Sequence, residues 1–499
     1  MDHSLDRREF LRRSCATAAA ALTMPHLALG QANSPRKPNI IFILTDDLGY
    51  AELGCYGQQK IRTPNLDRLA AQGVRFTQFY SGSTVCAPSR CCLLTGKHTG
   101  HAYIRDNGEL PTEGQRPIPA DTETLGRLLQ QAGYRTAAIG KWGLGGPDST
   151  GVPNRQGFDR WFGYLCQRHA HNHYPTYLWR NGEKVPLPDN PEFSAHQRLH
   201  QEPENREAYD QYTGRQYAPD LMCEEALQFI RANREQSFFL YYATTIPHLA
   251  LQVPEDSLRE YQDQWPETPY LGQRGYLPHP TPRAAYAAMI TRMDHDMGRL
   301  FALLDELGIA ENTLVMFSSD NGATFDVGGY DPAFFQDTGV LHGHKTNLYE
   351  GGIRVPLIAR WPGHIAPGTT SDHVCASWDI LPTLTAIASA DTPRDIDGIS
   401  LLPTLEGKAG QQEHDYLYWE FSSGGGSQAV RMDQWKGIRR NLKKNRDPRI
   451  ELYNLSADPS ESKDVAADHP DIVKQIAKIM HEARTESELF PLPTPPTSP

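Results

Sequence analysis

The sequence predicts an α/β fold: a large, mainly parallel sheet flanked by helices, followed by a smaller C-terminal antiparallel sheet with a helix. Several short apolar runs end abruptly in polar residues, and segments with helical periodicity lie between them. Near residue 413 the pattern changes to closely spaced strand-like runs. We therefore expect a main domain over 36–412, an α+β subdomain over 413–486 and a Pro-rich tail over 487–499 that is disordered.

Four apolar runs predict the parallel strands, and each is followed by residues that can do chemistry. The runs are 40–44, 136–139, 238–242 and 314–317. The polar residues that follow them are Asp46 and Asp47, Lys141, His248, and Asp320 and Asn321. In open α/β sheets the ligand crevice lies at the carboxyl ends of the strands. We expect these side chains to converge.

Two helices are marked by their ends and by their apolar spacing. Thr63 and Pro64 supply a cap and a first-position proline, and Gly73 supplies a stop. Methionines and leucines recur at helical spacing between Tyr286 and Leu307, which predicts a helix that packs on the sheet rather than a cofactor site.

The C-terminal part contains strand-like runs at 416–421, 430–438 and 450–455, with a glycine turn over 424–426. A helical pattern follows over 472–483. These elements predict a small antiparallel sheet with one helix.

Composition and charge limit the function classes. The chain has 499 residues, 39% hydrophobic and 22% charged, which is typical of a globular protein. Its formal net charge of -11 argues against a nucleic-acid binder or a protein that binds anionic membranes. Beyond the N-terminal segment no stretch contains the ~18 apolar residues that a membrane span needs. A small anionic substrate stays possible, because a few basic side chains can dominate one pocket.

Residues 1–32 resemble a twin-arginine export signal. Arg7 and Arg8 precede an apolar, Ala-rich stretch over 15–22, and small residues over 28–32 offer a cleavage site. The alternative is a basic amphipathic helix of the mature protein. The pattern favours a bacterial protein that the twin-arginine machinery exports, and hence a periplasmic or secreted location.

Seven cysteines follow the export signal, an odd number without regular spacing, which argues against a disulfide framework or structural zinc. One of them, Cys86, opens the segment Cys-Ala-Pro-Ser-Arg-Cys-Cys-Leu-Leu-Thr-Gly that ends at Gly96. This segment resembles the signature of type I sulfatases, arylsulfatase-like members of the alkaline phosphatase superfamily. The resemblance implies a sulfatase catalytic domain over 36–412, and oxidation of Cys86 to formylglycine by a formylglycine-generating enzyme. Without its neighbours, Cys86 would be interpreted as a buried thiol at a helix start.

Formylglycine suits sulfate esters because its hydrate carries two hydroxyl groups. One attacks sulfur, and the second can lose its proton and expel sulfate, which restores the aldehyde. Pro88 favours a helix that starts near Cys86, where backbone N–H groups attract an anion. Arg90 lies one helical turn further on and can hold the oxygens of the nucleophile.

The residues Asp46, Asp47, Asp320 and Asn321 form an all-oxygen ligand set, which suits Ca²⁺ or Mg²⁺ better than zinc. Either pair alone would be interpreted as an Asx turn or a helix cap. In the resembled family these positions, with the residue at Cys86, bind one divalent cation, usually calcium.

The resemblance extends to the substrate side. Lys141, His248 and Lys345 lie in segments similar to those whose Lys, His and Lys contact sulfate in the family, with the His as proton donor to the leaving oxygen. One position departs from the pattern: Gly143 stands where many sulfatases have a His that is a candidate base for expelling sulfate. The residues that could substitute are His101, His169, His171 and His173.

Three of these histidines form a His-x-His-x-His run. It could be a metal site, but alternating positions on a strand face favour a polar pocket wall, so we assign His169 and His171 to substrate binding.

The predicted activity is hydrolysis of an aryl or carbohydrate sulfate. Two alternatives remain open: a phosphoester or phosphonate hydrolase of the same superfamily, and an inactive binder of sulfated glycans. A two-zinc phosphatase would need a second set of Asp and His ligands. The missing His favours the inactive binder, whereas the complete Cys86 motif opposes it. Loops over 169–179 and 186–217 are expected to select the alcohol.

Overall fold

The computed structural model describes residues 36–111, 113–203, 205–445 and 448–493. The predicted export signal lies outside this part of the chain, as do the last six residues of the Pro-rich tail. No helix among the described residues is both long enough and apolar enough to cross a membrane.

In the part of the chain that the structure describes, the main sheet has ten strands, and its centre consists of the four strands that the sequence predicts. These are β9 (Thr313–Ser319), β1 (Asn39–Asp46), β8 (Phe238–Pro247) and β4 (Arg135–Lys141), which lie next to one another in this order and run parallel. On one side the sheet continues through β10 (Leu357–Arg360), β2 (Val74–Phe76) and β11 (Thr369–Ser371). On the other side it continues through β5 (Arg160–Tyr164), β6 (Tyr177–Arg180) and β7 (Glu183–Pro186).

Within the main sheet of the described residues, every antiparallel pair involves β10 or β6. Strand β10 is antiparallel to β9 and β2, and β6 is antiparallel to β5 and β7. The predicted α/β class with a mainly parallel sheet is therefore confirmed.

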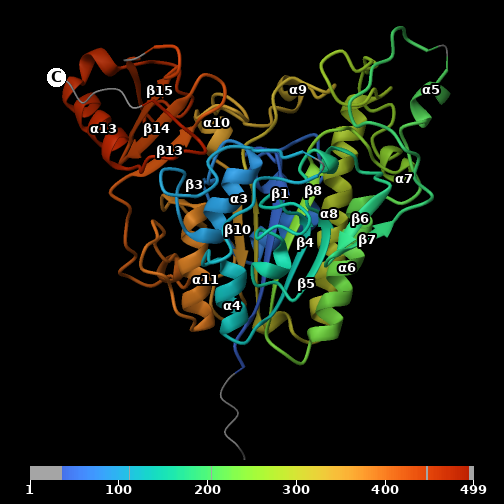
Figure 1. The fold of residues 1–499 in the computed structure, drawn as a ribbon, viewed down its shortest axis with the longest axis horizontal. Coiled ribbons are helices and arrows are strands. Elements are labelled where there is room, and N and C mark those ends of the chain that lie inside the picture. The colour runs from blue at the N-terminus through green and yellow to red at the C-terminus, as the bar shows by residue number, and fades with distance from the viewer. Residues whose placement is uncertain (1–35, 112, 204, 446–447, 494–499) are drawn as a thin grey trace, which may run out of the picture. The chain divides into compact units, whose positions relative to one another are not determined.

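Helices cover both faces of this sheet, as Figure 1 shows. Alternate residues of β1 enter different cores: Ile40 and Phe42 pack with α3 (Cys86–Thr95), α4 (Leu125–Gln131) and α11 (Ile380–Ala388). Ile41 and Ile43 pack with α2 (Pro64–Ala71), α6 (Ala218–Asn233) and α8 (Pro282–Glu306). Burial on both faces explains why the central strands are continuous apolar runs.

The predicted helices correspond to α2 and α8. Pro64 opens α2, and Pro282 opens α8, which is 25 residues long. The methionines Met289, Met293 and Met297 are all buried in the core, as the sequence predicts.

The C-terminal part is a four-stranded antiparallel sheet with one helix, which also confirms the prediction. Its strands are β13 (Leu417–Phe421), β14 (Ser427–Met432), β15 (Trp435–Arg440) and β16 (Ile450–Asn454), and α13 (Pro470–Glu482) packs on them. The prediction of one strand over 430–438 is wrong. The chain reverses at Asp433, whose φ is 50°, a left-handed conformation that Asp tolerates without a glycine signal.

Part of the predicted tail is packed rather than disordered. Phe490 and Leu492 are only 6% and 4% exposed, and Phe490 belongs to a core of the main sheet. The prediction of disorder is therefore wrong for these two residues, because hydrophobic burial anchors them. The domain boundaries proposed from the sequence stay predictions.

Candidate active site

The carboxyl ends of the four central strands bring the predicted site residues together. Asp46 and Lys141 are the last residues of β1 and β4, and His248 directly follows β8. Asp320 and Asn321 directly follow β9. Because these strands are neighbours and parallel, their ends meet at one edge. All these residues, and Asp47, are at most 2% exposed.

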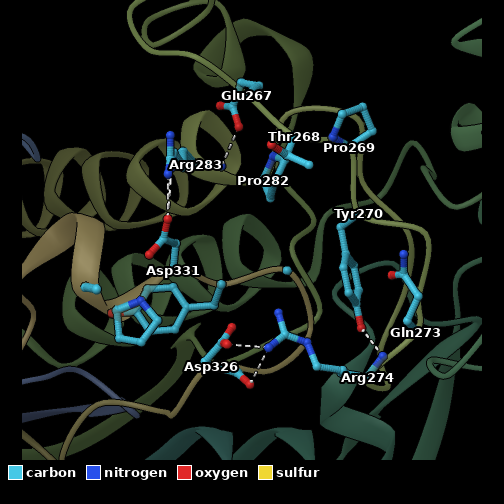
Figure 2. Close-up of a pocket in the computed structure, with 14 residues that line it drawn as sticks. Glu267, Thr268, Pro269, Tyr270, Gln273, Arg274, Pro282, Arg283, Asp326 and Asp331 are labelled. Carbon is cyan, nitrogen blue, oxygen red and sulfur yellow. Dashed lines mark hydrogen bonds and ion pairs between the residues drawn. The ribbon is translucent and has the colours of Figure 1, made fainter.

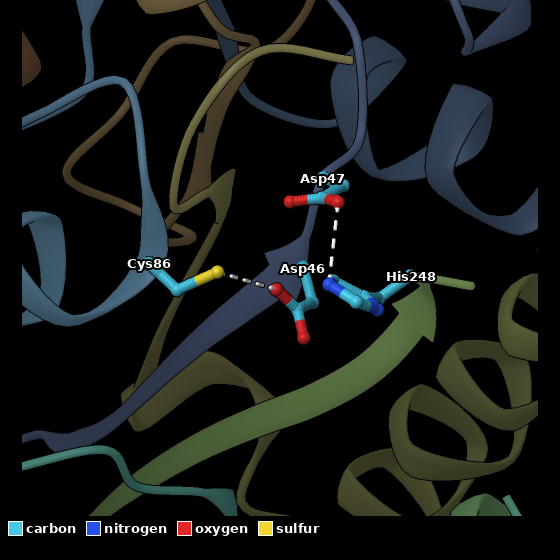
Figure 3. Close-up of side chains that lie close together, drawn as sticks. All are labelled: Asp46, Asp47, Cys86 and His248. Atoms are coloured by element: carbon cyan, nitrogen blue, oxygen red, sulfur yellow. Dashed lines mark hydrogen bonds and ion pairs between the residues drawn. The ribbon is translucent and has the colours of Figure 1, made fainter. Parts of the chain in front are cut away.

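Cys86 is the first residue of α3 and lies among charged groups at this edge (Figure 3). Its Sγ is 3.4 Å from Oδ1 of Asp46, 3.4 Å from Nζ of Lys141 and 3.6 Å from Nζ of Lys345. The N-terminus of α3 is capped from outside the helix, since the Ala87 N–H donates to Oδ1 of Asn107 at 3.1 Å. Cys86 therefore lies at a helix N-terminus between two ammonium groups, a setting that favours an anion.

Each buried cation in the cluster has a carboxylate partner. Lys141 Nζ is 2.7 Å from Asp46, and Lys345 Nζ is 2.7 Å from Asp47. Arg90 donates two hydrogen bonds to Oδ2 of Asp320, at 2.7 and 3.0 Å. This pairing offsets the cost of burying charges, and it pre-orients the cations around Cys86.

Burial and the paired charges shift the pKa values of the cluster. Burial raises the pKa of Cys86 to about 12, although Lys141 and Lys345 oppose it. Burial also opposes the charge on Asp46, but Lys141 and its other cationic neighbours hold the pKa of Asp46 well below its usual range. Burial and the charge of Asp46 raise the pKa of Asp320 to about 6. The Cys86 thiol is thus uncharged at neutral pH and is a poor nucleophile as it stands.

The same residues include oxygen donors of the kind that a hard cation prefers. One ligand atom each from Asp46, Asp47, Cys86 and His248 lie within 4.8 Å of one another. Asn321 donates to Oδ1 of Asp47 at 2.8 Å, whereas its own Oδ1 is buried without a hydrogen-bond partner among the described residues. An orphaned buried carbonyl oxygen beside carboxylates is the kind of atom that a calcium ion takes as a ligand.

The structure separates the two histidines assigned to substrate binding. His171 stacks on His248, with ring centroids 4.6 Å apart, so it borders the cluster. His169 instead packs on Tyr177, and its Nδ1 is 3.8 Å from Glu113. Both residues lie in a 3-10 turn (His169–His171). The turn is closed by backbone hydrogen bonds from the Ala170 N–H to Cys166 and from the His171 N–H to Arg168. The interpretation as a strand face is therefore wrong.

Two other candidates for the missing base are engaged in structural contacts. His173 Nε2 donates to the backbone oxygen of His248 at 2.8 Å, so His173 supports the position of His248. His101 Nδ1 lies 2.9 Å from Asp397 and its ring stacks on His98.

A side chain at position 143 would have to displace Gln167. Gly143 has a φ of 85°, and a Cβ placed on it would lie 2.5 Å from Nε2 of Gln167. Gln167 is buried and takes this space, with its Nε2 unpaired among the described residues. Sequence analysis missed the role of Gln167, although it begins the segment that contains the three histidines.

A separate cavity of about 620 Å³ is shown in Figure 2. Its walls come from 267–274, the start of α8 and the loop over 326–333, and they carry the ion pairs Arg274–Asp326 and Arg283–Asp331. None of the catalytic cluster described above is among its lining residues. The rings of Tyr276 and Tyr270 pack against Gly328 and Gly329 of this loop.

Comparison with known proteins identifies the family. A model of the sulfatase family matches residues 38–390, and a model of the N-sulphoglucosamine sulphohydrolase C-terminal region matches 342–487. The chain belongs to the sulfatase family. It is therefore a hydrolase of sulfate esters, as its Cys86 motif predicts.

Relatives of this sulfatase cover most of its length. N-acetylgalactosamine-6-sulfatase of Rattus norvegicus is 36% identical over 413 residues, which are 79% of this chain and 71% of that protein. N-acetylgalactosamine-6-O-sulfatase of Bacteroides thetaiotaomicron is 30% identical and covers 90% of this chain and 94% of that protein. The solved structure of Ps i-CgsB in complex with k-i-k-neocarrahexaose is 28% identical, with a TM-score of 0.71 over 90% of this chain and 92% of that one.

Proposed function

We propose that this sulfatase removes sulfate from a carbohydrate sulfate ester through a formylglycine hydrate derived from Cys86. The observation that carries the proposal is the place of Cys86, buried at a helix N-terminus within 3.6 Å of the ammonium groups of Lys141 and Lys345. An anionic sulfuryl group bound there would face two positive charges and the helix N–H groups.

A carbohydrate substrate is supported by the relatives. Two of them are named N-acetylgalactosamine-6-sulfatase and N-acetylgalactosamine-6-O-sulfatase, and the solved structure of Ps i-CgsB is a complex with k-i-k-neocarrahexaose. A solved phosphonate monoester hydrolase is 20% identical, with a TM-score of 0.62, and that likeness concerns the fold alone. Aryl sulfates serve in our proposal as small test substrates.

The chemistry requires a changed side chain at position 86. As a cysteine with a raised pKa, Cys86 would be a weak nucleophile, and an S-sulfated product would be slow to release. A formylglycine-generating enzyme would supply the two-electron oxidant that converts the CH₂SH group to a thioaldehyde, and water would replace its sulfur, which leaves as sulfide. The resulting aldehyde adds a second water to form the hydrate. One hydroxyl attacks sulfur and the alcohol leaves with a proton. The other hydroxyl then loses its proton, and C–O cleavage expels sulfate and restores the aldehyde.

The surrounding residues have separate roles in this scheme. Lys141 and Lys345 hold the sulfate oxygens, and Arg90 holds the nucleophile and Asp320 in place. His248 would protonate the departing alcohol through Nε2, because its Nδ1 donates to the backbone oxygen of Leu249 at 2.6 Å. Burial and Lys345 lower the pKa of His248 well below its ordinary value, so its Nε2 must take up this proton when the anionic substrate binds.

A calcium ion would be held by Asp46, Asp47, Asp320, Asn321 and the modified residue 86. When bound, it would lower the pKa of the hydrate and polarise the sulfate oxygens. The unpaired Oδ1 of Asn321 and the three buried carboxylates support this ligand set.

Replacement of Cys86 tests the proposal. The Cys86→Ala variant should lose at least about 10³-fold in kcat against a panel of sulfated sugars and aryl sulfates, because the nucleophile is absent. Intact-mass analysis of the unsubstituted protein should show formylglycine at position 86. Cys55→Ala is the matched control, since Cys55 is half-buried and packs outside the cluster. Turnover by Cys86→Ala at the rate of the Cys55→Ala control would refute the mechanism.

We further propose that the Arg7-Arg8 signal exports the folded and modified enzyme through the twin-arginine machinery to the periplasm or the medium. The support is the sequence pattern alone. Replacing both arginines with lysine should retain the protein in the cytoplasm, and cell fractionation would measure it. Continued export of that variant would argue against this route.

A further inference from the structure

A chain of hydrogen bonds connects a backbone amide to the histidine that borders the catalytic cluster. The N–H of Tyr276 donates to Nδ1 of His196 at 3.1 Å. Nε2 of His196 lies 3.2 Å from Nδ1 of His171, and His171 stacks on His248 with an angle of 20° between the rings. The ring of Tyr276 also packs near His171, with centroids 5.4 Å apart.

The backbone amide determines which nitrogen carries the proton in each ring. A backbone N–H can only donate, so Nδ1 of His196 must be the unprotonated nitrogen. Neutral His196 then carries its proton on Nε2 and donates it to Nδ1 of His171. His171 must accept at Nδ1, and its own proton is therefore on Nε2. Among the described residues, Nε2 of His171 has no hydrogen-bond partner.

Both rings are neutral at neutral pH. Burial, together with the charges of His248 and the two catalytic lysines, lowers the pKa of His171 well below its ordinary value. Burial and Arg168 also lower the pKa of His196. The stacking of His171 on His248, with ring centroids 4.6 Å apart, places the His171 ring beside the catalytic cluster.

We propose that His196 holds His171 as a fixed Nε2–H donor, and that this donor binds an oxygen of the leaving sugar next to the sulfate ester. This inference rests on the proposed carbohydrate sulfatase activity. It makes His171 a specificity-determining residue and His196 its positioning residue. It also removes His171 as the base that expels sulfate, because the nitrogen facing the substrate is already protonated and its other nitrogen is occupied by His196.

Kinetics on two substrates test the donor role. The comparison uses the best sulfated monosaccharide of the panel and 4-nitrophenyl sulfate, whose leaving group lacks sugar hydroxyls. His171→Phe keeps a stacked ring but loses the donor, so its kcat/KM should fall about 10- to 100-fold further on the sugar than on the aryl sulfate. Equal losses on both substrates would place His171 against the sulfate itself and overturn the proposal.

Variants at His196 test the positioning role. His196→Phe should reduce the ratio of sugar to aryl kcat/KM about three- to tenfold, and His196→Gln should recover most of it, because the Gln amide can donate to His171. His200→Phe, at another exposed histidine of the same loop, is the matched control. Equal ratios for His196→Phe and His196→Gln would overturn the relay.

Long-range ¹H–¹⁵N spectra provide a readout independent of turnover. His171 should give the Nε2–H tautomer in the unsubstituted protein and a mixture in His196→Phe. An Nδ1–H tautomer of His171 in the unsubstituted protein would refute the inference. If neither substrate is turned over, the proposed function fails, whereas the spectra still decide the tautomer.

Discussion

Lys436 provides the sharpest test of how a buried charge network stabilises this fold. Its Nζ lies 2.8 Å from Glu350 and 3.0 Å from Glu461, and all three side chains are fully buried. Lys436 belongs to β15, whereas Glu350 begins the short helix α10 (Glu350–Ile353), five residues after Lys345. The pair therefore joins the C-terminal sheet to the segment that carries a catalytic lysine. We predict a large loss of stability in Lys436→Met.

The structure sets the expected magnitude. Removing one partner of a buried ion pair leaves an uncompensated charge, which costs about 3–5 kcal/mol. Burial opposes the charge on Glu350, and Lys436 is the largest of the groups that nevertheless lower its pKa to about 2. Against an ordinary pKa of 4.5, that value corresponds to about 3 kcal/mol at neutral pH. Because Glu350 keeps Arg354 at 3.3 Å, we expect a loss near 3 kcal/mol.

Equilibrium unfolding in urea measures this loss, and its pH dependence has a definite sign. The folded-state pKa of Glu350 is depressed, so the stability it contributes is present above its unfolded pKa of 4.5 and disappears as the pH falls toward 2. The difference between Lys436→Met and the unsubstituted protein should therefore be largest at neutral pH and shrink on acidification. Lys463→Met, at an exposed residue of the same subdomain, should change stability by less than about 0.5 kcal/mol. A loss below about 1 kcal/mol for Lys436→Met at pH 7, or a difference that grows in acid, would refute the reasoning.

Two further predictions concern calcium and a partly buried histidine. Asn321→Leu keeps the branched shape of the side chain but removes its unpaired oxygen and its hydrogen bond to Asp47, so calcium affinity measured by calorimetry should fall about tenfold or more. Equal affinity would exclude Asn321 as a ligand. His414 lies 2.8 Å from buried Asp379, and although burial opposes the charge, this carboxylate raises the pKa of His414 above its ordinary value. The stability that this pair contributes is complete below about pH 6.5 and is lost as the pH rises through the raised folded-state pKa of His414. In urea unfolding, the free energy of unfolding of His414→Gln should therefore decline less over this pH range than that of the unsubstituted protein. An unchanged pH profile would contradict the pairing.

Much of the fold follows from local sequence patterns. The central strands are buried on both faces, so they are continuous apolar runs that can be recognised without a partner strand. The C-terminal hairpin at Asp433 was missed because Asp adopts its left-handed conformation without the glycine that usually marks such a turn. Burial of Phe490 also depends on a long-range contact, and the Pro-rich composition around it predicts the opposite.

The cluster around Cys86 was predictable for a related reason. Most of its members are polar residues at the ends of neighbouring parallel strands, and strand ends can be located in a sequence. Cys86 and Arg90 instead belong to α3, where their motif marks them. The sequence by itself therefore determined the strands, the Cys86 motif and the membership of the charged cluster. Only the tertiary structure decided which histidine of the run borders the charged cluster. His169, His171 and His173 are equally spaced in the chain, so the sequence does not distinguish them. The 3-10 turn and the residues after it direct the three rings to different neighbours. The roles of Gln167 and His196 were likewise decided by packing, since each depends on a partner that is distant in sequence. Gln167 packs beside the backbone of Gly143, and His196 accepts a hydrogen bond from the amide of Tyr276.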